Sequence, residues 1–201
     1  MKTYTITPCP AGGPDWSTVP ALRVEEVLWL PPADIRMSAQ LCYDGNALYV
    51  RQRAEEAHIR AEHRVPFSMV CEDSCMEFFF SPQEGDPRFF NFECNPNGCT
   101  FIGIETSCHD IVRLAPLNET ALFQVRTRRF EGGWELNYRI PHEFVRLFFP
   151  DYRPAPGWRL RANCYKCGDL TVQPHYMAWS PVRTAEPDFH QNPYFGIMAF
   201  A

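Results

Sequence analysis

A chain of 201 residues, 45% hydrophobic and 21% charged, can bury one hydrophobic core, and this composition excludes an intrinsically disordered protein. Its 19 basic and 24 acidic residues give a formal charge of -5, without the basic excess that binding to a phosphate backbone requires. The sequence also contains no run of about 18 to 20 apolar residues that would span a bilayer. We therefore expect neither nucleic acid nor a membrane as a partner.

The cysteines and the N-terminal residues bear on the cellular compartment. The chain has 9 cysteines, an odd number that fits free thiols better than a disulfide framework. Residues 1–20 contain Pro8, Pro10 and Pro14, where a secretory signal needs a continuous apolar run. We therefore expect a cytoplasmic protein with reduced cysteines.

Short apolar runs separated by 19 prolines predict strands along most of the chain. We expect a single domain over residues 1–201, with an N-terminal arm at 1–19. A first hairpin is predicted with strands at 37–43 and 47–51, and its turn at Asp44-Gly45-Asn46 is expected to use the positive φ angles that Gly and Asn tolerate. The charged segment 55–64 is predicted to be an exposed loop or a short helical turn.

The rest of the chain predicts further strands and one helix. Alternation at 123–128 and 134–140, joined through Glu131-Gly132-Gly133, indicates a second hairpin. One short helix is expected at 141–148, with Pro141 at its first position. Apolar runs at 177–181 and 194–200 suit buried strands. The predicted fold is an all-β sandwich with one short helix.

Three predicted strands share a pattern in which one face is apolar and the other polar. They cover residues 76–80, 90–94 and 160–165, and their polar faces carry Glu77, Asn91, Glu93, Arg161, Asn163 and Tyr165. A charge inside an apolar strand is costly unless it faces solvent, an ion partner or a ligand. A solvated sheet face explains any one of these residues. As a group they also suit sugar hydroxyls, which planar polar side chains recognise by paired hydrogen bonds.

Several residues on and near these strands also allow catalytic or metal-binding interpretations. Glu77 and Glu93 could instead be the two carboxylates of a glycoside hydrolase. Cys164 and Cys167 have the spacing of a zinc knuckle, which Cys71 and Cys75 could complete. Because Cys164 falls in the apolar phase of its strand, buried free thiols are favoured and no metal site is predicted. Thr106–Asp110 is interpreted as a polar loop.

Aromatic side chains matter because sugar rings stack on flat apolar surfaces. Most of the five tryptophans are expected in the core. Trp179 and the pair Phe189-His190 are the better candidates for stacking, with simple packing as the alternative.

Several short motifs, taken in order, resemble the family 9 carbohydrate-binding modules and their DOMON-like relatives from about residue 20 to the end. They are Asn46–Val50, Asp73–Phe79, Phe92–Gly98, Gly133-Trp134-Glu135, Ile140-Pro141, Arg161-Ala162-Asn163, Trp179-Ser180-Pro181 and Asn192–Gly196. The resemblance implies a β-sandwich of jelly-roll or immunoglobulin-like character. It also implies a non-catalytic module of the kind attached to xylanases and related polysaccharide enzymes, which holds a sugar end between two tryptophans.

The resemblance further implies where a ligand binds. The acidic contact of the family corresponds to Glu77, and its other polar contacts fall near Asn91 or Glu93 and at Asn163. This chain has Val70-Cys71 and Phe189-His190 where the family has its stacking tryptophans. A structural calcium ion, to which the turn at Asp44-Gly45-Asn46 could contribute, is also implied.

The predicted function is therefore carbohydrate binding, with a glycoside hydrolase and a sandwich used for protein interaction as alternatives. The predicted ligand-binding residues are Glu77, Asn91, Glu93, Arg161 and Asn163, with Trp179 and His190 near the rim.

Overall fold

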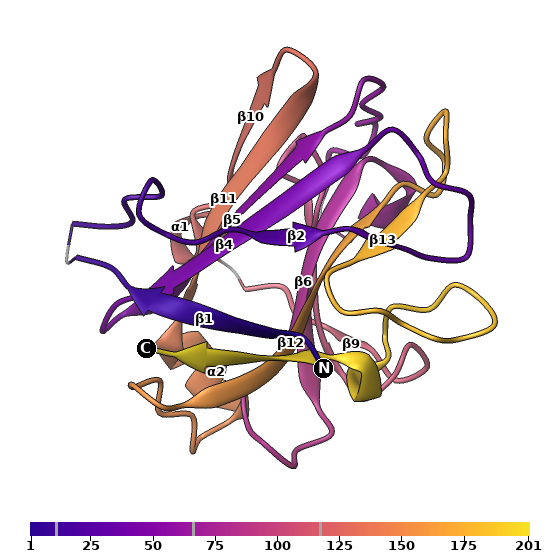
Figure 1. The fold of residues 1–201 in the computed structure, drawn as a ribbon. Coiled ribbons are helices and arrows are strands. Elements are labelled where there is room, and N and C mark those ends of the chain that lie inside the picture. Colours follow the sequence, from indigo (N-terminus) through magenta and orange to yellow (C-terminus); the bar gives the residue numbers. More distant parts are fainter. Residues whose placement is uncertain (11, 66, 117) are drawn as a thin grey trace.

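The computed structural model describes residues 1–10, 12–65, 67–116 and 118–201, and its strands form two layers that face each other (Figure 1). The first layer contains, in spatial order, β10 (Arg126–Phe130), β11 (Gly133–Pro141), β5 (Ala47–Glu55), β4 (Arg36–Tyr43) and β2 (Leu22–Val24). The second contains β14 (Gly196–Phe200), β12 (Arg159–Cys167), β6 (Cys75–Ser81), β7 (Phe89–Cys94), β8 (Thr100–Glu105) and β9 (Val112–Arg113). Beside β12 lie β13 (Tyr176–Ala178) and β3 (Glu26–Val27). An all-β sandwich is confirmed.

Strand β1 (Thr3–Pro8) connects the two layers. Its first four residues pair in parallel with β14, and Thr7 and Pro8 pair in parallel with β4. The segment predicted to be an N-terminal arm therefore begins with a strand that closes one side of the sandwich. Figure 1 shows β1 beside β14, with both chain ends on this side.

The main core fills the space between the layers. Alternation along β6 directs Phe78 and Phe80 into this core, and β11 contributes Leu136 from the other layer. These side chains are completely buried, and burying each apolar side chain of this size contributes about 1.5–3 kcal/mol. The core thus fixes which face of each strand points inward.

Two helices cover the open end of this core. The predicted helix is confirmed as α2 (His142–Phe148), although Pro141 precedes it as the last residue of β11 with an extended ψ of 135°. A second helix, α1 (Glu119–Phe123), was not predicted because five residues are too few to show a helical period. Short 3₁₀ turns lie at η1 (Val70–Glu72) and η2 (Asn192–Tyr194). Neither helix in the described ranges has the length and apolarity needed to cross a membrane.

Both predicted hairpins are present, although the strand predicted at 123–128 begins only at Arg126, because Phe123 is the last residue of α1. The first turn has a different cause from the one expected. Gly45 and Asn46 do not adopt positive φ. Instead, one carboxylate oxygen of Asp44 accepts the backbone N–H groups of Asn46 and Ala47 at 2.8 and 2.9 Å. The other oxygen accepts the Tyr49 hydroxyl at 3.0 Å. Both oxygens are thus used within the hairpin, and a structural calcium ion here stays a prediction.

A buried charged network closes the opposite end of the sandwich. The ammonium group of Lys166 is 0% exposed and lies 2.9 Å from Glu56 and 2.8 Å from the Nε2 atom of His175. The indole of Trp134 donates to the same carboxylate at 3.2 Å. Since these residues come from β12, β11 and two loops, the network ties both layers together. Of the loop predicted at 55–64, Glu55 is the exposed last residue of β5, Glu56 is buried in this network, and residues 57–64 form the irregular remainder.

Candidate functional site

The polar faces of the three predicted strands lie side by side on the outer face of the second layer. β12, β6, β7 and β8 are consecutive neighbours. In this register Glu77 lies directly opposite Glu93 on one side and Tyr165 on the other. Strand order could not be read from periodicity, so this adjacency comes from the structure. It brings the two predicted acidic residues together.

This outer face is covered by loops, which leave a pocket open above Glu77 and Glu93. A second hydrophobic core forms here from strand residues such as Phe79 and Phe89, and from loop residues such as Val182 and Phe189. Between them remains a pocket of about 500 Å³, within the range of about 300–1,000 Å³ for small-molecule sites. It is lined by Trp29, Met69, Cys71, Glu77, Glu93, Phe101, Cys108, His109, Ile111, Arg113, Cys167, Asp169, Tyr176, Pro187, Asp188, Phe189 and His190.

Two carboxyl groups form the polar floor of this pocket. Glu77 is 2% exposed and Glu93 is 7% exposed. The Cys167 thiol donates to Glu77 at 3.0 Å, and the Asn91 amide donates to Glu93 at 3.1 Å. Asn91 itself is fully buried and does not line the pocket, so it positions Glu93 from behind.

Burial raises the pKa values of both carboxyl groups, which favours their protonated forms. Desolvation is the main cause that raises the pKa of Glu77 to about 8. Desolvation, followed by the charge of Glu77, raises the pKa of Glu93 well above its usual value. A protonated carboxyl group donates one hydrogen bond and accepts others. The floor can therefore exchange both kinds of hydrogen bond with a polyol.

His190 lines the pocket and is held by a third acid. Its Nδ1 atom lies 2.8 Å from Glu105, a buried residue on β8. Burial alone would lower the pKa of His190, but the hydrogen bond and charge of Glu105 outweigh this effect and raise it. Its backbone N–H also donates to Asp188 at 2.8 Å. The ring is thus fixed beside the floor.

Aromatic rings form one wall of the pocket. The Phe189 ring stacks on Tyr165 with centroids 4.1 Å apart, and Trp29 packs on Phe189 and on Tyr176 at 5.5 Å. Trp29 has a φ of 55°, a left-handed conformation that is strained for a bulky residue. Its indole N–H donates to the carbonyl of Thr184 at 2.9 Å. The loops therefore hold Trp29 in a backbone conformation that a bulky residue rarely adopts.

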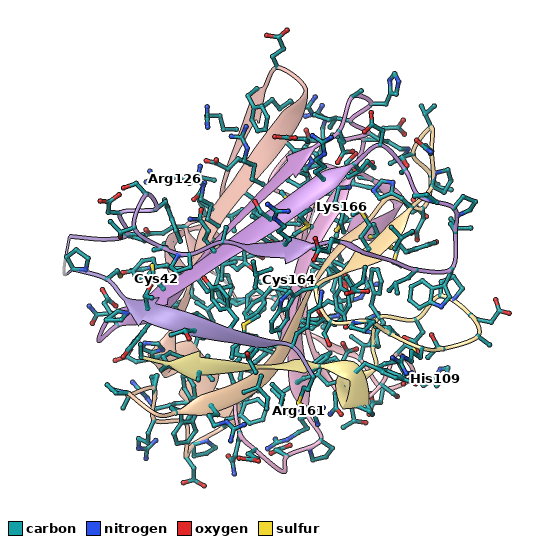
Figure 2. All side chains as sticks on the ribbon, viewed as in Figure 1. Cys42, His109, Arg126, Arg161, Cys164 and Lys166 are labelled. Atoms are coloured by element: carbon teal, nitrogen blue, oxygen red, sulfur yellow. The ribbon has the colours of Figure 1, made fainter. Side chains whose placement is uncertain are left out.

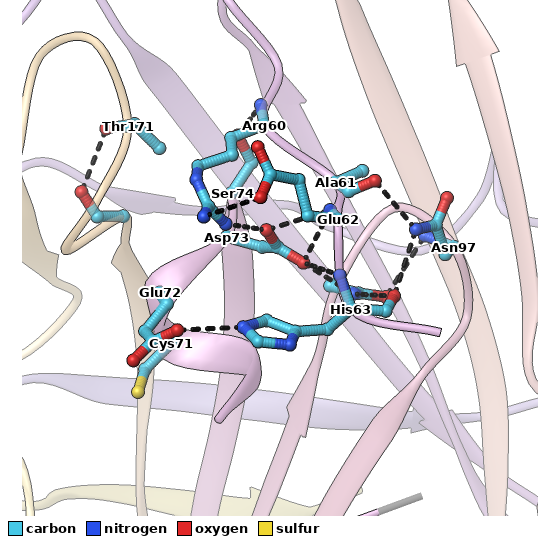
Figure 3. A network of polar contacts seen from close by, with 12 residues as sticks. Arg60, Ala61, Glu62, His63, Cys71, Glu72, Asp73, Ser74, Asn97 and Thr171 are labelled. Carbon is cyan, nitrogen blue, oxygen red and sulfur yellow. Dashed lines mark hydrogen bonds and ion pairs between the residues drawn. The ribbon is translucent and has the colours of Figure 1, made fainter. Parts of the chain in front are cut away.

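A polar network anchors the chain just before β6, which carries Glu77 (Figure 3). The buried carboxylate of Asp73 accepts the backbone N–H groups of Glu62 and His63 at 3.0 Å and is paired with Arg60. The Asn95 amide donates to the same carboxylate at 2.8 Å. Asp73 thus fixes the 60–63 loop and the start of β6 relative to each other.

Three predicted ligand residues lie elsewhere. Arg161 is near the start of β12, far along the strand from Lys166, and donates to the carbonyls of Asn192 and Pro193 (Figure 2). Asn163 is fully buried and bonded to the backbone of Ser180 in both directions, at 2.8 Å. Trp179 is 4% exposed in the main core, against Gly196. Its predicted place at the rim is corrected, because Trp179 lies in the bend after β13 and its indole packs into the main core.

Other lining residues were missed from the sequence. Trp29 and Tyr176 come from loops and short strands whose positions depend on the whole fold. Phe101 and Glu105 follow the same alternation on β8, opposite Glu93 and Phe89, so that pattern could have extended the polar face. The polar loop predicted at Thr106–Asp110 brings Cys108 and His109 to the mouth of the pocket.

This geometry bears on the three alternatives that the sequence left open: a glycoside hydrolase, a protein-interaction surface and a zinc site. A hydrolytic pair needs one ionised carboxylate beside one protonated carboxyl group, whereas the pKa values of both Glu77 and Glu93 are raised. A partner protein would need an open sheet face, and here loops cover it. The four-thiol zinc site is contradicted, because Cys164 points into the main core on the other side of the sheet.

A β-sandwich with a concave, loop-covered pocket of carboxyl and aromatic groups defines a binding module for a small polar ligand. The sequence profile described as carbohydrate-binding family 9 matches residues 15–200. The chain belongs to this family, and it is a non-catalytic carbohydrate-binding module.

Solved structures agree with this assignment. A Bacteroides uniformis ATCC 8492 protein, for which carbohydrate binding is proposed, is 28% identical, with a TM-score of 0.85 over 100% of this chain and 99% of its own. A family 9 module from Caldicellulosiruptor kristjanssonii in complex with glucose is 13% identical, with a TM-score of 0.72 over 100% and 96%. A module from the same organism in complex with cellotriose is 14% identical, with a TM-score of 0.71 over 99% and 93%. No curated protein sequence matches the chain.

Proposed function

We propose that the pocket above Glu77 and Glu93 binds the terminal residue of a glucose-containing oligosaccharide. The observation that carries this proposal is the pair of buried carboxyl groups, whose pKa values are raised, at the floor of a pocket walled by Trp29 and Phe189. A sugar has hydroxyls that donate and accept, and C–H faces that pack on aromatic rings. The pocket offers a counterpart for each.

The size and shape of the pocket favour a chain end. A volume of about 500 Å³ holds one or two sugar rings, and the carboxyl groups lie at its base rather than along an open groove. The glucose and cellotriose complexes of the similar Caldicellulosiruptor modules support a glucan as the ligand. A sugar that enters end first would place its terminal hydroxyls on Glu77 and Glu93 and its next ring near Trp29.

The test is calorimetric titration with glucose, cellotriose and xylotriose. We expect saturable heat with glucose and cellotriose, and weaker heat with xylotriose because it lacks the hydroxymethyl group. In Glu93→Ala, affinity should fall by about 10-fold or more, because lost hydrogen bonds to buried groups cost about 1–3 kcal/mol. Glu131→Gln, an exposed change at the β10–β11 turn, should bind as the wild type does. Saturable binding that Glu93→Ala leaves unchanged would contradict this site.

A cytoplasmic location is part of the same proposal. All nine cysteines are free thiols, and such a set is stable where the thiol pool is kept reduced. Alkylation of intact cells followed by mass spectrometry should find these cysteines unpaired. Recovery of the protein in the medium with paired cysteines would overturn this part.

A further inference from the structure

Two cysteines and one glutamate meet at the inner end of the pocket. Cys75 and Cys167 are directly opposed on β6 and β12, and Glu77 follows Cys75 by two residues on the same face of β6. One ligand-type atom from each of the three lies within 4.8 Å of the other two. No second group of three such side chains gathers within residues 1–10, 12–65, 67–116 and 118–201.

This spacing fits a tetrahedral metal ion. Zinc binds thiolate at about 2.3 Å and carboxylate at about 2.0–2.2 Å, so the ligand atoms of such a site lie roughly 3.3–3.8 Å apart. The cluster is already within 4.8 Å, and small side-chain rotations would bring it to that geometry. Two sulfur atoms and one oxygen atom select a thiophilic cation over calcium or magnesium.

The cluster is also rigid, buried and surrounded by acids. Cys75 is 0% exposed, Cys167 is 2% exposed, and both belong to a continuous antiparallel ladder. Glu93 lies opposite Glu77, and Asp169 lines the same pocket. A bound dication would favour the ionised form of Glu77 and of these neighbouring carboxyl groups. Glu77 and Cys167 both face the pocket, which leaves the fourth coordination position directed toward it.

We propose that Cys75, Cys167 and Glu77 form a binding site for a thiophilic divalent cation such as Zn²⁺ or Cd²⁺, with the fourth ligand supplied from the pocket. The two sulfur atoms bind as thiolates and Glu77 binds as a carboxylate, so the protons of all three groups pass to the solvent on binding. This site goes beyond sugar binding and is independent of it, except that the two share Glu77. A bound cation should therefore weaken sugar binding.

The test is a titration of the full-length protein with Cd²⁺ in the presence of a phosphine reductant, which keeps all thiols reduced. We expect one equivalent per chain and the ultraviolet charge-transfer absorption of a cadmium–thiolate bond. Either Cys75→Ser or Cys167→Ser should abolish this stoichiometric absorption. The variant Glu77→Gln should weaken Cd²⁺ binding by more than about 10-fold, because replacing even a residue that only hydrogen-bonds to a metal ligand typically lowers metal affinity by about 10-fold or more.

Cys9→Ser is the matched control. Cys9 lies beside Cys42, a residue of the first layer, and this change removes another close thiol pair without touching the pocket. It should bind Cd²⁺ as the wild type does. No cadmium–thiolate absorption in the wild type, or full absorption in Cys75→Ser, would overturn the proposal. If the serine variants fail to fold, the isosteric Glu77→Gln still tests the site: undiminished Cd²⁺ affinity in this variant would overturn the assignment of Glu77 as a metal ligand. Glucose titration without metal reports separately on the sugar site.

Discussion

Glu77 and Glu93 lie directly opposite each other on β6 and β7, with both carboxyl groups buried at the floor of one pocket. Like charges opposed on neighbouring strands are destabilising, and the pair is tolerated because burial favours the protonated forms. The raised pKa values favour a pair of neutral hydrogen-bonding groups over two negative charges. In the proposed function, this relationship lets an acidic pocket receive an uncharged sugar.

The first prediction concerns stability against pH. The pKa values of Glu93 and Glu105 are raised in the folded protein, chiefly by burial. Between the unfolded pKa, near 4.5, and the higher folded value, the native state binds more protons than the unfolded state. The stabilisation from Glu93 is thus complete below the unfolded pKa and is lost as pH rises through the folded pKa. The loss is up to about 1.4 kcal/mol for each pH unit between the two pKa values.

The measurement is urea unfolding of the wild type and of Glu93→Gln from pH 5 to pH 8. Glutamine keeps the shape and stays neutral, so the wild type should lose stability relative to the variant as pH rises. Taking the difference cancels the opposite contribution of His142 and His175, whose pKa values are lowered by burial. A difference that is constant over this range would contradict the protonated state of Glu93.

The second prediction concerns the buried ion pair of Lys166 and Glu56. Lys166→Met leaves a buried carboxylate without its cation, which should lower the free energy of unfolding by about 3–5 kcal/mol. Adding Glu56→Gln should restore much of this loss, because the uncompensated charge is removed. Arg36→Met, in an exposed pair with Glu55 at 3.7 Å, should cost less than about 1 kcal/mol. Equal losses for the two single variants in urea unfolding would show that burial of the Lys166 pair does not matter.

The third prediction separates two tryptophans. Trp29 lines the pocket, whereas Trp179 packs in the main core. Trp29→Ala should weaken sugar binding by about 5-fold, a loss of about 1 kcal/mol of aromatic contact. Trp179→Phe should lower the melting temperature and leave the affinity unchanged. Calorimetry and thermal unfolding on both variants check this, and the reverse pattern would return Trp179 to the binding site.

The fourth prediction uses a glycine behind the site. A Cβ atom at Gly103 would collide with the side-chain oxygen of Asn91, which orients Glu93. Gly103→Ala should therefore destabilise the protein by about 1–3 kcal/mol and also weaken sugar binding. Gly45→Ala is the control, since a Cβ atom there would meet no other atom within 4 Å and the φ of Gly45 is not positive. Urea unfolding that finds both alanines equally harmless would contradict the close packing of Asn91.

Alternation along the chain predicted much of the sandwich but only part of the site. A period of two identifies which residues share a face, and it correctly placed Glu77 and Glu93 together with Asn91. It does not say what covers that face, and here loops bury it. Asn163 shares the face, but its side-chain amide is hydrogen-bonded to the backbone of Ser180. Arg161 shares it too, but lies too far along β12 to reach the pocket.

The aromatic wall could not be predicted from local sequence. Trp29 reaches Phe189 across 160 positions of the chain through loops without a regular period. The β1 strand was missed for a related reason, since its pairing with β14 joins the two ends of the chain. Hairpins, whose contacts are local, were predicted well. Long-range packing between loops cannot be predicted from local sequence patterns.

The most direct test of the sugar pocket is NMR titration of isotope-labelled protein with cellotriose. Amide signals at Glu77, Glu93 and residues 188–190 should shift together and saturate, while those around Arg161 and the β10–β11 turn should stay in place. Shifts confined to another surface, or none at millimolar cellotriose in the folded protein, would contradict glucan binding in this pocket.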